Sequence, residues 1–196
     1  MPHYSDDTPL EKTFFITAKS RGVSLELESG AGLFSKDKLD TGTKLLLESC
    51  SLPEQGRVLD LGCGIGAVGI FVKTWLPNLE VVQSDVTEKA VLLTKKNARK
   101  SRVETIVVQS DCYDNLKGEV FDAILVNPPR AAGKAVIEKM IREAPSHLNK
   151  NGSLQLVALT NKGGKSYEKM MKEAFGNVET IARGSGFKVY KSTKTI

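Results

Sequence analysis

A glycine-rich loop preceded by an acidic residue carries the strongest chemical signal in the sequence. The segment VLDLGCGIGAVG begins at residue 58 and places Asp60 just before the glycines. Glycines allow a sharp turn and the close approach of a ligand, and a following helix directs its first backbone N–H groups toward that ligand. The loop therefore predicts a small-molecule site at the end of a strand, with a turn that binds no ligand as the simpler alternative.

Two ligands compete for this loop. The spacing Gly64-x-Gly66-x-x-Gly69 matches the dinucleotide fingerprint. Asp85 follows at the distance expected of a ribose-binding acid. Asp60 favours the other ligand, because a carboxylate suits the ammonium and sulfonium of S-adenosylmethionine better than an anionic pyrophosphate. An NAD-dependent dehydrogenase is further disfavoured, because no His, Lys or Tyr stands at a strand end as an evident catalytic group.

Acids also end the next two predicted strands. Asp85 follows VVQS, and Asp111 and Cys112 follow IVVQS. A single aspartate at a strand end is usually a turn or capping residue. In succession around one glycine loop, these residues suggest a nucleoside site. Asp85 would then accept both ribose hydroxyls, Asp111 would accept the adenine amino group, and the Cys112 N–H would meet the ring edge.

The fourth predicted strand runs directly into Asn127-Pro128-Pro129. Prolines lack the N–H that a sheet needs, so the strand ends here and the backbone is stiff. The Asn127 side chain and the Pro128 carbonyl can then grip a planar –NH2 group and aim its lone pair at an electrophile. Alignment of this kind is most of what methyl transfer requires. A rigid strand terminator is the alternative without a ligand.

Composition excludes several other functions. The cysteines, Cys50, Cys63 and Cys112, are far apart and form no CxxC pair, and the histidines are only His3 and His147. No metal site, disulfide framework or Ser-His-Asp hydrolase is therefore expected. The chain has 196 residues, 40% hydrophobic and 26% charged, without an apolar run long enough to cross a membrane or a secretion signal at its start. We expect one cytoplasmic domain over 12–196 after a flexible segment 1–11.

The elements that must position these residues begin with a hairpin. Strand character over 14–17 and 23–27 around Arg21-Gly22 predicts this hairpin, and a loop over 30–38 and a helix over 41–50 follow it. Strands and helices then alternate. Strands are expected at 58–61, 79–83, 103–109, 121–126 and 153–159, helices at 67–76, 87–100, 134–148 and 165–175, and a closing hairpin at 178–182 and 187–191.

This alternation predicts an α/β fold of the Rossmann-like, doubly wound type. We expect a mostly parallel seven-stranded sheet with one antiparallel strand in a C-terminal hairpin, and a small N-terminal β-hairpin. In such sheets ligands bind beyond the carboxyl ends of the strands. The glycine loop, the acids and Asn127 all follow predicted strands, so they should meet at one edge.

Together these motifs resemble class I S-adenosylmethionine-dependent methyltransferases. The Asn-Pro-Pro form resembles enzymes that methylate adenine or guanine amines or a glutamine amide. Upstream, the segment GLFSKDKLDTGTKLL over 32–46 resembles the "methyltransferase small domain" family, which includes ribosomal small-subunit RNA guanine-N2 methyltransferases and compact single-domain archaeal relatives. The resemblance covers about residues 22–192, which is nearly the whole chain.

The resemblance implies a role for each matching residue. Asn127, Pro128 and Pro129 would bind the acceptor nitrogen and carry catalysis, with Asn127 also at the cofactor. Residues implied to hold S-adenosyl-L-methionine are Phe34, Asp40 and Thr43 beside its methionine end, Asp60, Gly62, Gly64 and Gly66 around that end, Asp85 and Val86 at the ribose, and Asp111 and Cys112 at the adenine.

The resemblance has two departures. Many enzymes with this motif place an aromatic residue next, whereas this chain has Arg130, whose guanidinium can also stack on a base and makes glutamine methylation less favoured. The bacterial rRNA enzymes also carry a second, N-terminal domain, for which the chain leaves no room. RNA would then be positioned by the same domain or by a dimer.

Basic residues suggest where RNA would bind. The net charge is +5, with 7 basic and 10 acidic residues in 1–60 but 21 basic and 13 acidic in 61–196. The densest basic run, over 95–102, is interpreted as a solvated helix face. Cations near Asn127 point to phosphate contacts around a target base. We expect substrate contacts from Arg130, Lys134, Lys162, Arg183 and the apolar Phe187.

The sequence therefore predicts an S-adenosylmethionine-dependent N-methyltransferase acting on guanine N2 of ribosomal RNA. Its partner would be RNA, without metal or membrane, and it would be a monomer or homodimer. Methylation of protein glutamine or of a small molecule remains open, as does a nucleotide-binding module without transferase activity. An intact Asn127-Pro128-Pro129 segment disfavours the module, because a binding module has no need of an amine grip.

Overall fold

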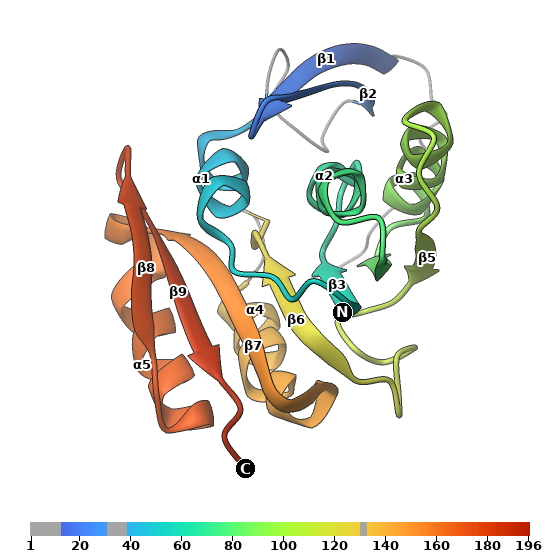
Figure 1. Ribbon diagram of the computed structural model, residues 1–196. Helices are drawn as coiled ribbons and strands as arrows, with labels where there is room; N and C mark the ends of the chain where they lie inside the picture. The colour runs from blue at the N-terminus through green and yellow to red at the C-terminus, as the bar shows by residue number, and fades with distance from the viewer. Residues whose placement is uncertain (1–12, 31–38, 130–132) are drawn as a thin grey trace.

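A seven-stranded sheet forms the centre of the molecule (Figure 1). The computed structural model describes residues 13–30, 39–129 and 133–196. The strand order is β5-β4-β3-β6-β7-β9-β8, and β1 and β2 form a separate two-stranded sheet. The strands are β1 Thr13–Ser20, β2 Val23–Gly30, β3 Gly56–Leu61, β4 Leu79–Asp85, β5 Ile106–Gln109, β6 Phe121–Val126, β7 Leu148–Leu159, β8 Glu179–Gly184 and β9 Phe187–Thr193.

Strand directions confirm the predicted fold class. The pairs β3–β4, β3–β6, β4–β5 and β6–β7 are parallel, whereas β9 is antiparallel to both β7 and β8. The C-terminal hairpin thus inserts one antiparallel strand into a parallel sheet. The order reverses between β3 and β6, which is where an open α/β sheet leaves a crevice for a ligand.

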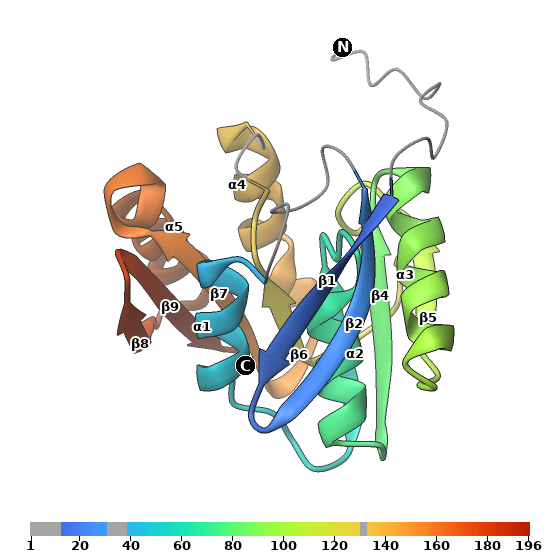
Figure 2. The ribbon, with the colours of Figure 1, turned by 90° about the horizontal axis from the view of Figure 1, so that it is seen from above.

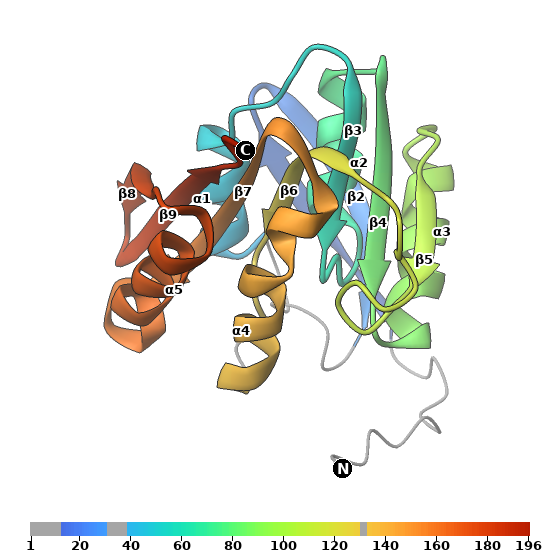
Figure 3. The same cartoon turned by 90° about the horizontal axis from the view of Figure 1, so that it is seen from below.

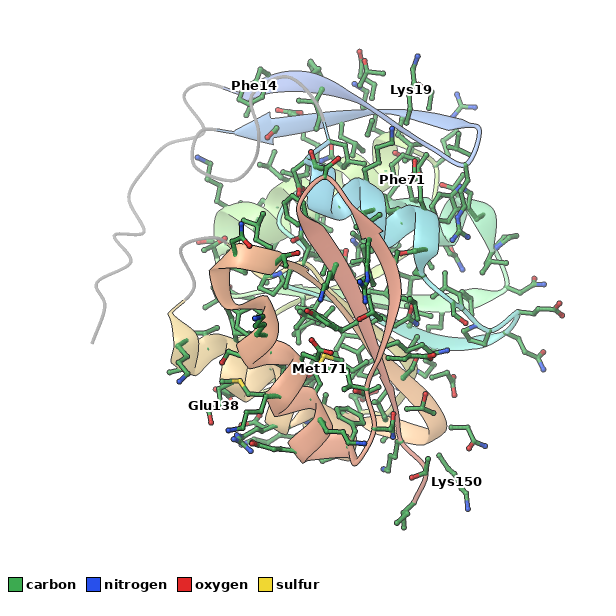
Figure 4. The ribbon with its side chains drawn as sticks, turned by 90° about the vertical axis from the view of Figure 1, so that its left-hand side faces the viewer. Phe14, Lys19, Phe71, Glu138, Lys150 and Met171 are labelled. Carbon is green, nitrogen blue, oxygen red and sulfur yellow. The ribbon has the colours of Figure 1, made fainter. Side chains whose placement is uncertain are left out.

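Helices cover both faces of the sheet (Figures 1 and 3). One face carries α1 Thr41–Ser49, α2 Ala67–Trp75 and α3 Glu88–Lys100, and the other carries α4 Lys134–Arg142 and α5 Lys165–Phe175. The β1–β2 hairpin lies on the outer side of the layer that α1, α2 and α3 form (Figure 2). The two hydrophobic clusters match these layers: Phe71 is buried in one and Met171 in the other (Figure 4).

Two predicted elements were too long. The helix expected over 134–148 ends at Arg142, and a 3-10 turn, Ala144–His147, follows, because Pro145 has no N–H to continue the helix. The strand expected from Val103 begins only at Ile106. Arg102 has φ 56° and the Val103 N–H donates to the Ala98 carbonyl, so these residues complete the C-terminus of α3.

Strand β7 was predicted too short. It begins at Leu148, not at Ser153, because Leu148 already pairs with Phe121 before a bulge shifts the register to Ala123 and Ser153.

Over the residues that the structure describes, no helix combines the length and apolar character that crossing a bilayer requires.

Candidate active site

Three adjacent strands bring the predicted site residues to one edge of the sheet. β3 lies between β4 and β6, and Leu61 pairs with Ser84 on one side and Val126 on the other. The glycine loop after β3, Asp85 at the end of β4 and Asn127 after β6 therefore emerge side by side. This confirms that these segments share one end of the sheet, as their positions after predicted strands implied.

The glycine loop adopts a backbone that other residues would strain. Gly62, Gly64 and Gly66 have φ of 76°, 57° and 83°. Gln83 of β4 fills the space beneath the loop, and a Cβ added to Gly69 would lie 2.4 Å from its Cδ atom. The Gln83 amide nitrogen donates to the Gly66 carbonyl at 3.0 Å. The loop is therefore moulded around a buried glutamine side chain.

Asp60 is enclosed under the same loop. It is only 3% exposed, and its Oδ2 accepts from the Gly69 N–H at 2.9 Å and from the Gln83 amide at 3.0 Å. Burial raises the pKa of Asp60 to about 6, against the lowering effect of these hydrogen bonds, and nearby Asp85 adds to the rise. A cation beside this carboxylate would restore its charged form.

Helix α3 holds the loop from the other side. The Thr94 hydroxyl donates to the Gly64 carbonyl at 3.0 Å, and the Asn97 amide donates to the Ile65 carbonyl at 2.9 Å. Asn97 also donates to the Glu28 carbonyl at 2.9 Å and accepts from the Glu28 N–H at 2.7 Å. Asn97 thus ties the loop to β2 of the N-terminal hairpin.

These supporting residues were missed as parts of the site by sequence reasoning. Gln83, Thr94 and Asn97 are all fully buried. The available signal was polar residues at positions that the strand and helix patterns assign to the interior, since buried polar groups need partners. Asn97 shares the buried face of α3 with Leu93 and Thr94, so its partners come from other segments.

Asp85 reaches into the glycine loop. Its Oδ2 accepts from the Gly64 N–H at 3.0 Å, and its Oδ1 accepts from the Thr87 N–H at 3.0 Å and the Thr87 hydroxyl at 3.1 Å. Next to it, the Val86 side chain is 45% exposed and offers an apolar surface at the end of β4. Contacts of both residues with ribose stay a prediction.

The third strand end places Asp111 and Cys112 beside α4. The Asp111 side chain is exposed, with Oδ1 3.9 Å from the Lys139 Nζ. Cys112 is buried with φ 50°, and burial raises the pKa of its thiol to about 12, so the thiol stays protonated near neutral pH. A role for these residues in binding adenine stays a prediction.

Asn127 is linked to the start of α1. Its Nδ2 donates to the Thr43 Oγ1 at 2.7 Å and lies 3.4 and 3.3 Å from the two carboxylate oxygens of Asp40. Asp40 caps α1 by accepting from the Thr43 N–H at 3.1 Å, and the Thr43 hydroxyl donates to its other oxygen. Asn127 is therefore held by two residues far from it in sequence.

A small pocket joins this group to the glycine loop. Asp60 and Asn127 both line it, together with Thr43. Asp40 itself is not among the residues that line the pocket. The lining residues are Thr43, Asp60, Gly62, Cys63, Ala67, Val68 and Asn127.

The predicted substrate residues are only partly brought together. Phe187 packs against the start of α1, where a Cβ on Gly42 would lie 3.0 Å from its ring. Lys134 and Arg183 are exposed, at the first turn of α4 and near the end of β8. Phe34 and Arg130 lie outside the described residues, as does the segment 1–11, and the Lys162 side chain is likewise not described.

The basic run on α3 is only in part a solvated face. Lys96 forms an ion pair with Glu28 and Lys100 with Glu26, each at 2.5 Å, and both glutamates belong to β2. The Lys100 ammonium also lies 3.7 Å from the ring centre of Phe15. These lysines therefore help to hold the hairpin on α3, whereas Lys95 and Arg99 are exposed.

Comparison with known proteins gives a consistent family. The family model described as "Methyltransferase small domain" matches residues 24–191. Ribosomal RNA small subunit methyltransferase C from Hamiltonella defensa is 37% identical over 173 residues, which are 86% of this chain and 50% of that protein. YbxB from Bacillus subtilis, described as uncharacterized, is 31% identical over 197 residues and is matched over 98% of both chains.

A solved structure supports the same relationship. The 16S rRNA N2 guanine methyltransferase RsmC of T. thermophilus, in complex with AdoMet and guanosine, superposes with a TM-score of 0.83 and 28% identity. The match covers 95% of this chain and 52% of that chain. The chain thus spans about half the length of the rRNA methyltransferases that it matches.

Proposed function

The chain belongs to the methyltransferase small domain family, and from this premise we propose that it is an S-adenosylmethionine-dependent N-methyltransferase acting on guanine N2 of ribosomal RNA. The observation that carries the proposal is Asn127. Asn127 lines the same small pocket as Asp60 and the glycine loop, and two prolines follow it. An amine grip thus adjoins a site suited to a cationic cofactor.

The residues present fit S-adenosylmethionine. Asp60 is a carboxylate buried at the pocket wall, and a bound ammonium or sulfonium group would favour its ionised form against the burial that raises its pKa. Asp85 stands at the next strand end with carboxylate oxygens that can accept ribose hydroxyls. When bound, S-adenosylmethionine supplies an electrophilic methyl group. The glycine backbone and these two acids would hold it.

The acceptor amine would be held by oxygen atoms alone. Thr43 and Asp40 engage the Asn127 amide nitrogen, so the amide oxygen remains to accept an N–H of the substrate. The Pro128 carbonyl would accept the second N–H. Two acceptors fix the plane of the amine and leave its lone pair directed at the methyl group, which is the alignment that the transfer needs. The amine loses its proton readily once nitrogen gains charge.

The ribosomal RNA substrate is supported by the relatives. Several curated relatives are named as rRNA small subunit methyltransferases, and the RsmC structure contains guanosine. Lys134 and Arg183 are exposed cations at positions that could contact phosphates, and Phe187 lies beside the helix that holds Asn127. Substrate contacts from Arg130 and Lys162 stay predictions from the sequence. A cytoplasmic location and a monomeric or homodimeric state stay predictions.

Transfer of labelled methyl groups tests this function. The purified chain is incubated with labelled S-adenosylmethionine and with small-subunit rRNA, total RNA or total protein, followed by nuclease or protease. We expect label in rRNA that nuclease releases and that nucleoside analysis identifies as N2-methylguanosine. Label that only protease releases, or label in another nucleoside, would contradict the proposed substrate. No label in any fraction would contradict the transferase activity.

A further inference from the structure

The hydrogen bonds between Asp40, Thr43 and Asn127 have only one possible direction. A carboxylate has acceptors only. The Thr43 hydroxyl therefore donates its single proton to Asp40, and its oxygen must accept the bond from Asn127. The Asn127 group that faces Thr43 must then be the Nδ2 donor, and the Oδ1 acceptor is directed elsewhere.

Asp40 also enforces this direction on Asn127 itself. Its carboxylate oxygens lie 3.3 and 3.4 Å from the Asn127 Nδ2, a weak attraction for an N–H group but a repulsion for a carbonyl oxygen. Thr43 is 1% exposed, so water does not compete effectively for its hydroxyl. Within a buried chain of hydrogen bonds, each bond polarises and strengthens the next.

We propose that Asp40 and Thr43 are positioning residues for methyl transfer, which set the Asn127 amide so that it offers oxygen, not nitrogen, to the acceptor amine. The inference rests on the proposed function of Asn127 as an amine grip. A reversed amide would present a donor to another donor and would repel the substrate. Asp40 and Thr43 thus act through Asn127 and need not touch the substrate.

Helix capping alone does not explain Asp40. The cap uses one oxygen, Oδ1, which accepts from the Thr43 N–H. The second oxygen, Oδ2, accepts from the Thr43 hydroxyl and faces Asn127. Asparagine caps a helix as well as aspartate does. The directional role, by contrast, requires an acceptor at the second position, so an asparagine there separates the two roles.

The Asp40→Asn variant is the primary test. Its Oδ1 would keep the cap to the Thr43 N–H, which places the new Nδ2 beside the Thr43 hydroxyl and Asn127. Thr43 would then accept from residue 40 and donate to Asn127, and the Asn127 amide would reverse. We expect kcat for methyl transfer to fall by about 100-fold, because misplacement of one reacting group has this effect. The melting temperature should change little, and kcat should fall by a much larger factor than the affinity for S-adenosylmethionine.

Thr43 provides a matched pair of variants. Thr43→Val keeps the shape but removes the hydroxyl, so kcat should fall by about tenfold or more, in line with loss of a positioning contact. Thr43→Ser restores the hydroxyl and should recover most of that loss. A merely structural role would lower the melting temperature in proportion to activity. A kcat for Asp40→Asn within threefold of the unmodified chain would overturn the inference.

Two further outcomes would also overturn the inference. One is an Asp40→Asn variant that loses cofactor affinity by the same factor as kcat, since Asp40 would then act on the cofactor. The other comes from NMR of the chain labelled with 15N-asparagine, where the Asn127 side-chain signals are identified by their loss in Asn127→Asp. We expect Asp40→Asn and Thr43→Val to shift these signals and Thr43→Ser to restore them, whereas unshifted signals contradict the network.

The NMR measurement needs no methyl acceptor, so it separates this inference from the proposed function. If the unmodified chain methylates no RNA or protein but the Asn127 signals move as expected, the hydrogen-bond direction stands and the proposed function fails. If the chain methylates RNA and Asp40→Asn is fully active, the function stands and the positioning role fails.

Discussion

The proposed cofactor side and the proposed acceptor side of the site are built differently. On the cofactor side, the glycine loop is held by buried polar side chains from β4 and α3, and Asn97 extends this network to the N-terminal hairpin. On the acceptor side, Asn127 is held by Asp40 and Thr43 at the start of α1, and Pro129 is exposed. The first side is part of the core, and the second lies at its edge.

This difference separates stability from chemistry. Residues under the glycine loop satisfy buried backbone groups, so their loss should weaken the fold and the cofactor site together. The Asn127 amide is partly exposed, and Asp40 and Thr43 hold it in place. Loss of any of these side chains should therefore reduce catalysis while the fold survives. Variants on each side can therefore test whether the two functions are as separate as the contacts indicate.

Asn127→Ala should produce the largest effect and tests the acceptor side. Both the oxygen acceptor and its orientation are lost, so kcat should fall by about 1,000-fold or more, the size seen when a group that stabilises a transition state is removed. Cofactor affinity, measured by calorimetry, should stay within threefold. Asn78→Ala, at an exposed asparagine between α2 and β4, is the control. Near-normal turnover of Asn127→Ala would show that the amine is held elsewhere.

Asn97→Ala tests the cofactor side. Three hydrogen bonds to Glu28 and Ile65 are lost and buried backbone groups remain unpaired, so the free energy of unfolding should drop by about 3 kcal/mol. Urea unfolding measures this change. Lys95→Ala on the exposed face of the same helix should change stability by less than about 0.5 kcal/mol. Equal stability of the two variants would mean that the hairpin and loop are not coupled through Asn97.

The pH dependence of cofactor binding probes Asp60. Burial raises the pKa of Asp60 from 3.8 to about 6. Without ligand, the contribution of Asp60 to the free energy of unfolding therefore favours the fold at low pH and is lost as pH rises through about 6. A cationic ligand prefers the ionised carboxylate, so the affinity for S-adenosylmethionine should increase as pH rises. We expect binding about tenfold weaker at pH 5 than at pH 7. Calorimetry with Asp60→Asn should show a flatter profile, and an unchanged slope would assign the effect to another group.

Lys134→Ala should have the smallest effect and tests whether the acceptor side extends to RNA. Loss of one phosphate contact should weaken RNA binding about threefold and lower the magnitude of the salt slope by about one. Lys150 lies near the start of β7, at the opposite end of the sheet, so Lys150→Ala serves as the control (Figure 4). Filter binding at several salt concentrations measures both. Equal slopes for the two variants would place the RNA path away from α4.

Much of the cofactor side could be predicted because its signals are local. Asp60 and the glycines are close in sequence, and Asp85 ends the next strand, so hydrophobic patterning was enough to bring them to one edge. The helix that begins at Lys134 is shorter than expected, because Pro145 has no N–H with which to continue it. Val103 was assigned to a strand, because its β-branched side chain outweighed its role in ending α3.

The amino-acid pattern was sufficient for the fold class and for the segments that form the site, because alternating strands and helices permit few arrangements. The order of the strands came from the structure. The amino-acid pattern did not show which residues orient the Asn127 amide or which residues support the loop. The orientation depends on Asp40 and Thr43, which lie 87 and 84 residues from Asn127. The support of the loop depends on Asn97, which lies 69 residues from Glu28. Hydrogen bonds over such separations have no local sequence signature, since only folding brings donor and acceptor together.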